Sequence, residues 1–135
     1  GVQRVALIDF DVHHGNGSED IFRGDERVLM CSIFELGIYP FTGENAQGDN
    51  MVNIGLPSRS GRDNSREAVS QQWMPALDAF KPEMIYIAAG CDEQRGDDMG
   101  NLALVEADYE WVTKQIMAVA NRHCKGRVIS CLEGG

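Results

Sequence analysis

The chain has 135 residues, of which 43% are hydrophobic, so it is the size of one domain or part of one and can bury a sizeable core. Its net charge of −9 argues against electrostatic binding to nucleic acid or an anionic membrane and favours cationic partners. The sequence contains no signal peptide, no lipidation motif, no CxxC pair and no apolar run of ~18 residues. We therefore expect a cytoplasmic protein with reduced cysteines.

Apolar runs alternate with helical or loop segments along the chain. The segment "NSREAVSQQWMPALDAF", residues 64–80, opens with Asn64 and Glu67 at capping-box spacing, which predicts a helix that Pro75 kinks or breaks. Residues 106–123 have helical apolar spacing and acidic residues in their first turn, which predicts a second helix. The apolar runs predict five strands, at residues 4–9, 27–33, 51–56, 83–90 and 127–130.

Strands separated by helical crossovers predict an α/β fold, with a mainly parallel β-sheet flanked by helices on both faces. Ligands bind beyond the carboxyl ends of the strands in such sheets. Polar side chains follow four of the predicted strands, namely Asp9, Asp11, Ser32, Asp92 and Glu133. We expect them to converge at one edge, beside a long Gly-rich and Asn-rich loop at residues 34–50.

The segment "IDFDVHHGNG", residues 8–17, carries the strongest chemical signal. Alternate residues of an extended segment point to the same side, so Asp9, Asp11 and His13 present their side chains together. Taken singly, Asp11 is explained as a turn carboxylate and His13 as a core histidine. Together with Asp92 after another strand, Asp11 and His13 offer mixed oxygen and nitrogen ligands with one coordination position open. That combination predicts a catalytic zinc site.

His14 has two interpretations of equal weight. It orients a metal ligand or bonds a backbone carbonyl, or else it is a histidine that packs in the core.

These segments resemble the zinc-dependent histone deacetylases and their bacterial relatives, the acetoin-utilisation and acetylpolyamine amidohydrolase group. "DFDVHHGNG" is similar to the family pattern D-x-D-x-H-H-G-[DN]-G, "AAGCDEQRGDDMGN" to G-x-D-x-x-x-x-D, and "LEGG" to the start of E-G-G-Y. The motifs occur in the family's order across nearly the whole chain, and bacterial class II-like members are the nearest likeness. The resemblance implies an arginase/deacetylase-like fold.

The resemblance also implies the bound ions. Zinc would be held by Asp11, His13 and Asp92, a ligand set that Fe(II) also tolerates. One K+ ion would lie among the side chains of Asp9 and Ser32 and the carbonyls of Asp11, His13 and Ile33. A second K+ ion would lie among the carbonyls around Phe22, Asp25 and Val28.

The substrate implied is a small acetylated amine or an acetyl-lysine peptide. Tyr39 matches the aromatic residue that lines the acyl-lysine channel, although it is also explained as a loop residue that packs on its own turn. Gly134 and Gly135 would form the floor of the pocket. Two positions depart from the family: Phe41 stands where a glycine is common, and Glu93 follows Asp92 where relatives often have alanine.

The family's catalytic histidine pair lies upstream of the first motif, and its catalytic tyrosine would follow Gly135. We therefore expect residues 1–135 to be the central part of a single deacetylase-like domain, nearly inactive alone. The first alternative is an arginase-like binuclear hydrolase, which needs carboxylates where this chain has Gly15 and Gln94. The second is a non-catalytic, metal-stabilised module that binds acyl-lysine. The sequence is also compatible with an oligomer.

Overall fold

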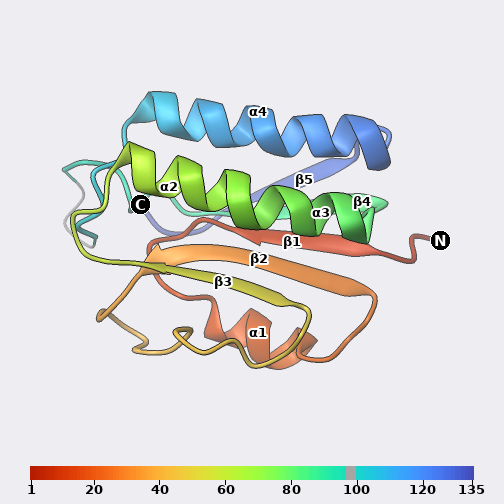
Figure 1. The fold of residues 1–135 in the computed structure, drawn as a ribbon, viewed down its shortest axis with the longest axis horizontal. Helices are drawn as coiled ribbons and strands as arrows, with labels where there is room; N and C mark the ends of the chain where they lie inside the picture. Colours follow the sequence, from red (N-terminus) through yellow and green to blue (C-terminus); the bar gives the residue numbers. More distant parts are fainter. Residues whose placement is uncertain (97–99) are drawn as a thin grey trace.

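A computed structural model describes residues 1–96 and 100–135 of the chain (Figure 1). The second aspartate of the G-x-D-x-x-x-x-D pattern, Asp97, lies outside this part. The strands are β1 (Val5–Asp9), β2 (Val28–Glu35), β3 (Met51–Leu56), β4 (Met84–Ala89) and β5 (Val128–Leu132). The helices are α1 (Asn16–Phe22), α2 (Arg62–Ala68), the π-helical turn η1 (Val69–Trp73), α3 (Met74–Phe80) and α4 (Glu106–His123).

The five strands form one parallel sheet in the order β3-β2-β1-β4-β5, which confirms the predicted α/β fold. The chain builds outward from β1 to β3, then crosses back to place β4 on the other side of β1. Strand order therefore reverses between β1 and β4, and ligands bind at such reversals in open α/β sheets. The motif residues after β1 and after β4 flank this point.

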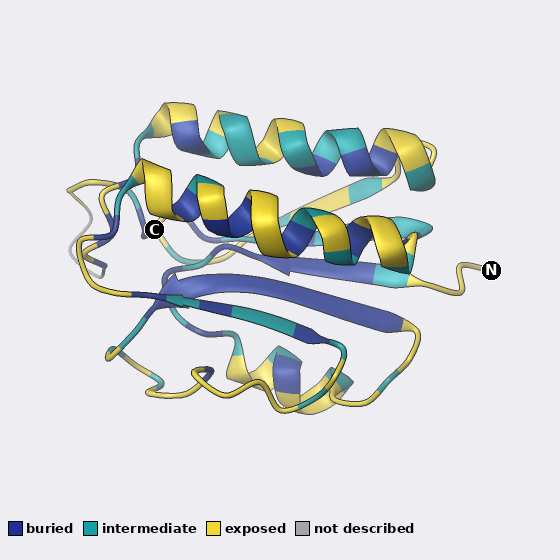
Figure 2. Ribbon diagram, in the orientation of Figure 1, coloured by how far each residue is buried: buried dark blue, intermediate teal, exposed yellow. Residues whose placement is uncertain are grey.

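The two faces of the sheet are covered unequally. Among the described helices, α2, α3 and α4 lie along one face of the sheet and α1 lies on the other (Figure 1). The larger core cluster belongs to the first face and contains the fully buried side chains of Trp73, Leu77 and Ile85. Buried residues concentrate in the central strands in Figure 2, but β5 leaves Ile129 43% and Leu132 75% exposed. Helices thus lie on both faces of the sheet, as predicted, although they leave β5 partly exposed.

The helical segment expected at residues 64–80 differs in its start and its middle. It begins at Arg62 after Gly61, so Asn64 lies inside the first turn and makes no cap. The helix continues through Pro75 without a break, because the preceding turn, Val69–Trp73, adopts π-helical bonding. A wider turn accommodates a residue that has no N–H to donate.

Two elements near the site also differ from expectation. Strand β2 runs two residues beyond its predicted end, to Glu35, so Ser32 lies well inside the strand, opposite Asp9 of β1. Helix α1 was not predicted, because its seven residues include a glycine and no side chain caps its start.

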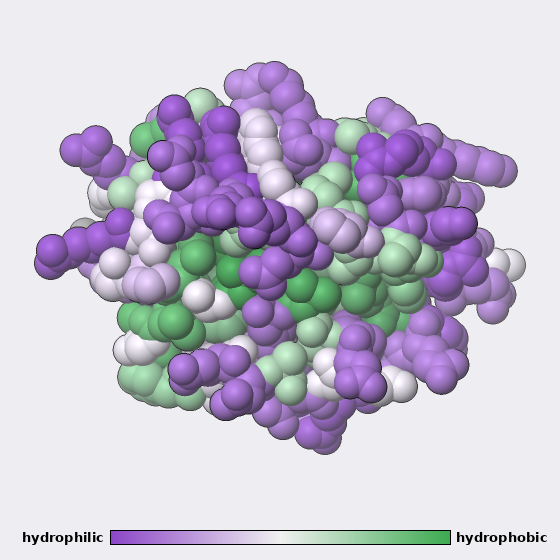
Figure 3. Space-filling view, in the orientation of Figure 1, coloured by the Kyte–Doolittle hydropathy of each residue, from purple (hydrophilic) through white to green (hydrophobic). Residues whose placement is uncertain are grey.

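Figure 3 shows hydrophilic residues over the helices and a hydrophobic band across the middle of this face. None of the described helices is both long and apolar enough to cross a membrane.

Candidate metal centre

Three side chains from two chain segments meet beyond the carboxyl ends of β1 and β4. One ligand atom from each of Asp11, His13 and Asp92 lies within 4.8 Å of the other two. The His13 Nδ1 atom is 3.0 Å from Asp11 Oδ1 and 3.2 Å from Asp92 Oδ2. The structure thus brings together the three residues that the sequence predicted as metal ligands, although they lie up to 81 residues apart in the chain.

Backbone N–H groups hold the two aspartates in place. The Val12 N–H donates to Asp92 Oδ1 at 2.9 Å, and the His13 N–H donates to Asp11 Oδ1 at 2.9 Å. The Gly134 N–H donates to Asp11 Oδ2 at 2.9 Å. A Cβ atom on Gly134 would lie 2.3 Å from Asp92 Oδ2 and 2.7 Å from Asp11 Oδ2, so only glycine fits against the pair. Gly134 therefore lies directly against the two aspartates, and its role in the floor of a substrate pocket stays a prediction.

Gly135 lies against the same segment. Its φ is +91°, and a Cβ atom there would lie 2.6 Å from the Asp92 backbone nitrogen. Glycine meets both demands, the left-handed φ and the close approach.

Negative charge accumulates at this edge. Burial raises the pKa of Asp9 to about 7, the Asp11 N–H opposes that shift, and the charges of Asp11, Glu133 and Asp92 add to it. Burial also raises the pKa of Asp92, with Asp11 contributing, while the Val12 N–H lowers it. A bound cation would relieve this repulsion and would favour the ionised carboxylates.

The geometry fits a tetrahedral metal ion. Ligand atoms about 2.0–2.1 Å from a zinc ion are separated by about 3.3 Å in a tetrahedron, close to the two distances from His13 Nδ1. Two carboxylates and one imidazole also match the oxygen and nitrogen ligands that zinc accepts. Without a metal, the same side chains form a hydrogen-bonded Asp–His–Asp cluster.

The first expected monovalent-cation site also fits its residues. Asp9 is 5% exposed, and its Oδ1 atom accepts the Asp11 N–H at 3.0 Å. Among the described residues, no cationic side chain pairs with Asp9. Ser32 is buried beside it across the β1–β2 ladder and donates its hydroxyl to Asn53, which leaves oxygen lone pairs free for an ion.

The second expected cation site is arranged differently. The carbonyl oxygens of Phe22, Asp25 and Val28 do converge, but they surround the Nδ2 atom of Asn50 at 2.8, 3.2 and 3.0 Å. A side-chain amide therefore lies where the resemblance implies an ion.

His14 belongs to a buried polar chain beside the metal residues. Its Nδ1 atom lies 2.8 Å from Thr42 Oγ1, and its Nε2 atom lies 3.5 Å from a carboxylate oxygen of Glu19. The other Glu19 oxygen accepts the amide of Asn53 at 2.6 Å. Neither contact of His14 is with a metal ligand or a backbone carbonyl. Sequence reasoning did not find Glu19, whose only signal is a carboxylate in the segment after the metal motif.

Tyr39 stands beside the site. Its ring centroid is 6.4 Å from that of His13, nearly edge-on, and the residue is 71% exposed. This exposure disfavours the interpretation that Tyr39 packs on its own turn. Phe41, two residues on, is 76% exposed and has a φ of +61°, a conformation that glycine adopts more readily than phenylalanine.

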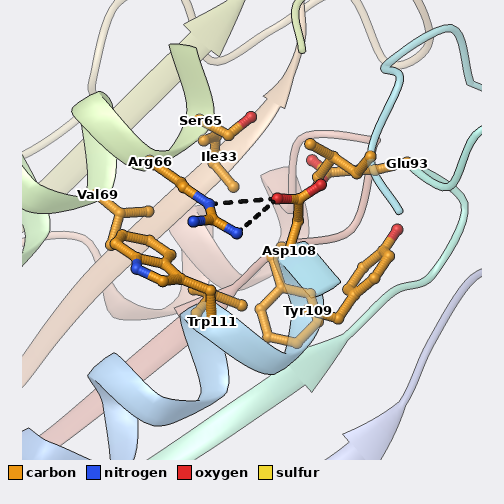
Figure 4. Close-up of a pocket in the computed structure, with 11 residues that line it drawn as sticks. Ile33, Ser65, Arg66, Val69, Glu93, Asp108, Tyr109 and Trp111 are labelled. Atoms are coloured by element: carbon orange, nitrogen blue, oxygen red, sulfur yellow. Dashed lines mark hydrogen bonds and ion pairs between the residues drawn. The ribbon is translucent and has the colours of Figure 1, made fainter. Parts of the chain in front are cut away.

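Glu93 extends the acidic cluster into the core behind Asp92. It is 1% exposed, and burial with the neighbouring carboxylates raises its pKa well above the usual value. It lines a cavity of about 30 Å³ whose other wall carries the Arg66–Asp108 ion pair (Figure 4). Such a volume admits about two water molecules and no substrate.

The fold and the site define an α/β protein with three candidate metal-ligating side chains at a strand-order reversal. Comparison with known proteins agrees with this class. The chain matches the "Histone deacetylase domain" family over residues 1–135. It belongs to the histone deacetylase family.

Two relatives and one solved structure illustrate the similarity. "Type-2 histone deacetylase 2" of Dictyostelium discoideum is 42% identical over 153 residues, covering 100% of this chain and 9% of the relative. "Histone deacetylase-like amidohydrolase" of Pseudomonas aeruginosa is 32% identical over 142 residues, covering 100% and 37%. The structure of the histone deacetylase Clr3 superposes with a TM-score of 0.90 at 31% identity, covering 99% and 24%. The chain thus spans well under half the length of these proteins.

Proposed function

We propose that the protein containing this chain hydrolyses an acetylated amine, either acetyl-lysine or an acetylpolyamine, to the free amine and acetate. The proposal assigns a resident zinc ion to Asp11, His13 and Asp92, and a K+ ion to the surroundings of Asp9. The observation that carries it is the meeting of three ligand atoms within 4.8 Å at the carboxyl edge, in a chain of the deacetylase family. We further propose that the protein acts in the cytoplasm.

Zinc at this position would act as a Lewis acid toward the amide carbonyl and would lower the pKa of a bound water. The residues of this chain supply the frame for that chemistry. N–H groups of Val12, His13 and Gly134 fix both aspartates before any ligand arrives, so little reorganisation is needed. The exposed ring of Tyr39 lines the approach to His13, and the acidic surroundings attract a cationic amine.

The site favours one divalent ion over two. A binuclear centre would need a carboxylate at position 15, but a Cβ atom there would lie 2.4 Å from Asp9 Oδ2. Position 94, the other place for a bridging carboxylate, is a glutamine. The arginase-like alternative is therefore not supported by the packing around Asp9.

Amide hydrolysis also requires proton transfer and stabilisation of an oxyanion. The resemblance assigns these tasks to a histidine pair and a tyrosine that no residue of the 135 matches. Loss of acid–base catalysis costs ~10²–10⁴-fold and loss of oxyanion donors ~10²–10³-fold. We therefore propose that residues 1–135 bind zinc but turn over acetylated substrates at close to the background rate.

The test is metal analysis by mass spectrometry of the purified chain, beside Asp11→Ala and Asp92→Ala. A matched control is Glu110→Ala, which removes an exposed carboxylate on α4. We expect near-stoichiometric zinc in the wild type and the control and little in the two site variants. Equal zinc in all four proteins, or none in the wild type, would show that the cluster is hydrogen-bonded structure.

Deacetylation is measured in parallel on a fluorogenic acetyl-lysine peptide and on an acetylated polyamine. We expect negligible turnover of both by the zinc-loaded chain. Turnover near that of an intact family enzyme would refute the proposed division of the machinery. The same assay on a longer protein that includes this chain, with and without Asp92→Ala, tests the hydrolase activity itself and separates it from a non-catalytic acyl-lysine-binding module.

A further inference from the structure

The turn that joins α1 to β2 gathers three backbone carbonyls around one point. Two successive backbone bonds shape it, from the Asp25 N–H to the Phe22 carbonyl and from the Val28 N–H to the Asp25 carbonyl, each 3.0 Å long. The three carbonyl oxygens each lie 2.8–3.2 Å from Asn50 Nδ2. Partial negative charge from three peptide dipoles is thus directed at a single donor.

The orientation of the Asn50 amide follows from its other contact. Its Oδ1 atom accepts the Gly24 N–H at 3.0 Å. If the amide were flipped, Oδ1 would face three carbonyl oxygens and Nδ2 would face an N–H donor, so every contact would become repulsive. The –NH2 group therefore faces the carbonyls, and its hydrogens occupy the position of positive charge.

The backbone around Asn50 holds this side chain in place. The Asn50 carbonyl accepts the Met30 N–H at 2.9 Å, and the Met51 N–H donates to the Gly48 carbonyl at 3.1 Å. The residue thus joins the start of β3 to β2 and, through its amide, to the turn after α1. A cation at the centre of the three carbonyls would meet the amide hydrogens and could enter only if the side chain left all four of its hydrogen bonds.

We propose that the Asn50 amide replaces the second monovalent cation in this protein, so that the carbonyls of Phe22, Asp25 and Val28 form an amide-filled ring and not a cation site. The α1–β2 turn is then fastened by a neutral group whose contribution does not depend on K+. This inference is independent of the catalytic proposal, because it concerns a site other than the Asp–His–Asp centre.

The isosteric variant Asn50→Asp tests the proposal. It places a carboxylate oxygen among the three carbonyls and should turn the ring into a cation site. The matched control Asn45→Asp adds the same charge on an exposed loop residue. All variants carry Asp9→Asn as well, which removes the first predicted K+ site, and thermal midpoints are compared in KCl and tetramethylammonium chloride at equal ionic strength.

We expect no K+-specific shift for Asp9→Asn alone or with Asn45→Asp, and a rise of about 5 °C for Asp9→Asn with Asn50→Asp. A K+-specific shift in either of the first two proteins would overturn the proposal, because K+ would then bind in proteins that keep the Asn50 amide. Absence of a shift with Asn50→Asp would also overturn it, since the ring would then be unable to hold a cation.

A crystallographic measurement covers the case in which the variants do not fold. Crystals of the wild-type chain grown with RbCl are examined for anomalous scattering. We expect no rubidium peak among the carbonyls of Phe22, Asp25 and Val28. A peak at that point would show that an ion displaces the amide.

Discussion

The acidic cluster at the carboxyl edge and the carbonyl ring around Asn50 both bring several oxygen atoms close together, but they differ in whether the protein itself compensates the negative charge. In the ring, three oxygen atoms face an internal donor that satisfies them. In the cluster, burial and the charges of Asp11, Glu133 and Asp92 raise the pKa of Asp9, while the Asp11 N–H lowers it. A protein region that completes its own hydrogen bonds is structural, whereas one that leaves negative charge uncompensated is prepared for a ligand.

The largest expected effect comes from Gly134→Ala, which disrupts the packing of the acidic cluster. The new Cβ atom would lie 2.3 Å from Asp92 Oδ2 and would force the two aspartates apart. We expect zinc affinity to fall by ~100-fold, the upper range for altered support of metal ligands. Competition with a chromogenic chelator measures it, and Gly17→Ala is the control, since no atom lies within 4 Å of a Cβ atom there. Unchanged affinity would mean that Gly134 does not shape the site.

A smaller effect is expected from Glu19→Ala, which tests a case between the acidic cluster and the hydrogen-bonded ring. Glu19 is a buried carboxylate whose partners are the neutral amide of Asn53 and the ring of His14. Its removal leaves both polar groups without this partner and should lower the free energy of unfolding by about 2 kcal/mol. Urea denaturation measures the change. Asp20→Ala is the control, because Asp20 is exposed and pairs with Arg23 only at the surface, where pairs contribute about 0–1 kcal/mol.

The smallest effect is a pH dependence of stability at an ion pair that belongs to neither region. Arg122, and then His123, on α4 lower the pKa of Asp78 on α3. Because the folded pKa lies below the unfolded value, this carboxylate stabilises the fold above that unfolded value and loses its contribution as pH falls through the folded pKa. Asp78→Asn should therefore destabilise the chain by less than about 1 kcal/mol at neutral pH. The difference from wild type should vanish in strong acid, as chemical denaturation across pH would show.

Much of the fold was predictable because its strands are continuous apolar runs buried in a parallel sheet. The predicted bounds of β1 and β3 agree with the structure to within one residue. Helix α1 was missed because short helices depend on tertiary packing more than on local signals. The start of α2 was misplaced because the capping-box spacing of Asn64 and Glu67 also occurs inside a helix.

The candidate site also has features that the sequence predicted and features that it could not. Because side chains alternate along an extended segment, the sequence predicted that Asp11 and His13 lie together. Because parallel strands end at the same edge of a sheet, it also predicted Asp92 beside them, and the structure brings the three together. Their role as ligands stays a prediction. The amide of Asn50 could not be anticipated, because its three acceptors lie 22 to 28 residues away and backbone carbonyls leave no trace in a sequence. The burial of Glu93 likewise depends on helices that pack over it.

The reversal of strand order between β1 and β4 has a kinetic consequence. The bonds that hold the aspartates join Val12 to Asp92 across 80 residues and Gly134 to Asp11 across 123 residues. Contacts of such long sequence separation form slowly, because the chain must lose loop-closure entropy before the pairing contacts stabilise it. The candidate metal site therefore assembles only after β4 and β5 have docked, and if it binds zinc as proposed, zinc added during refolding should bind only in the final phase.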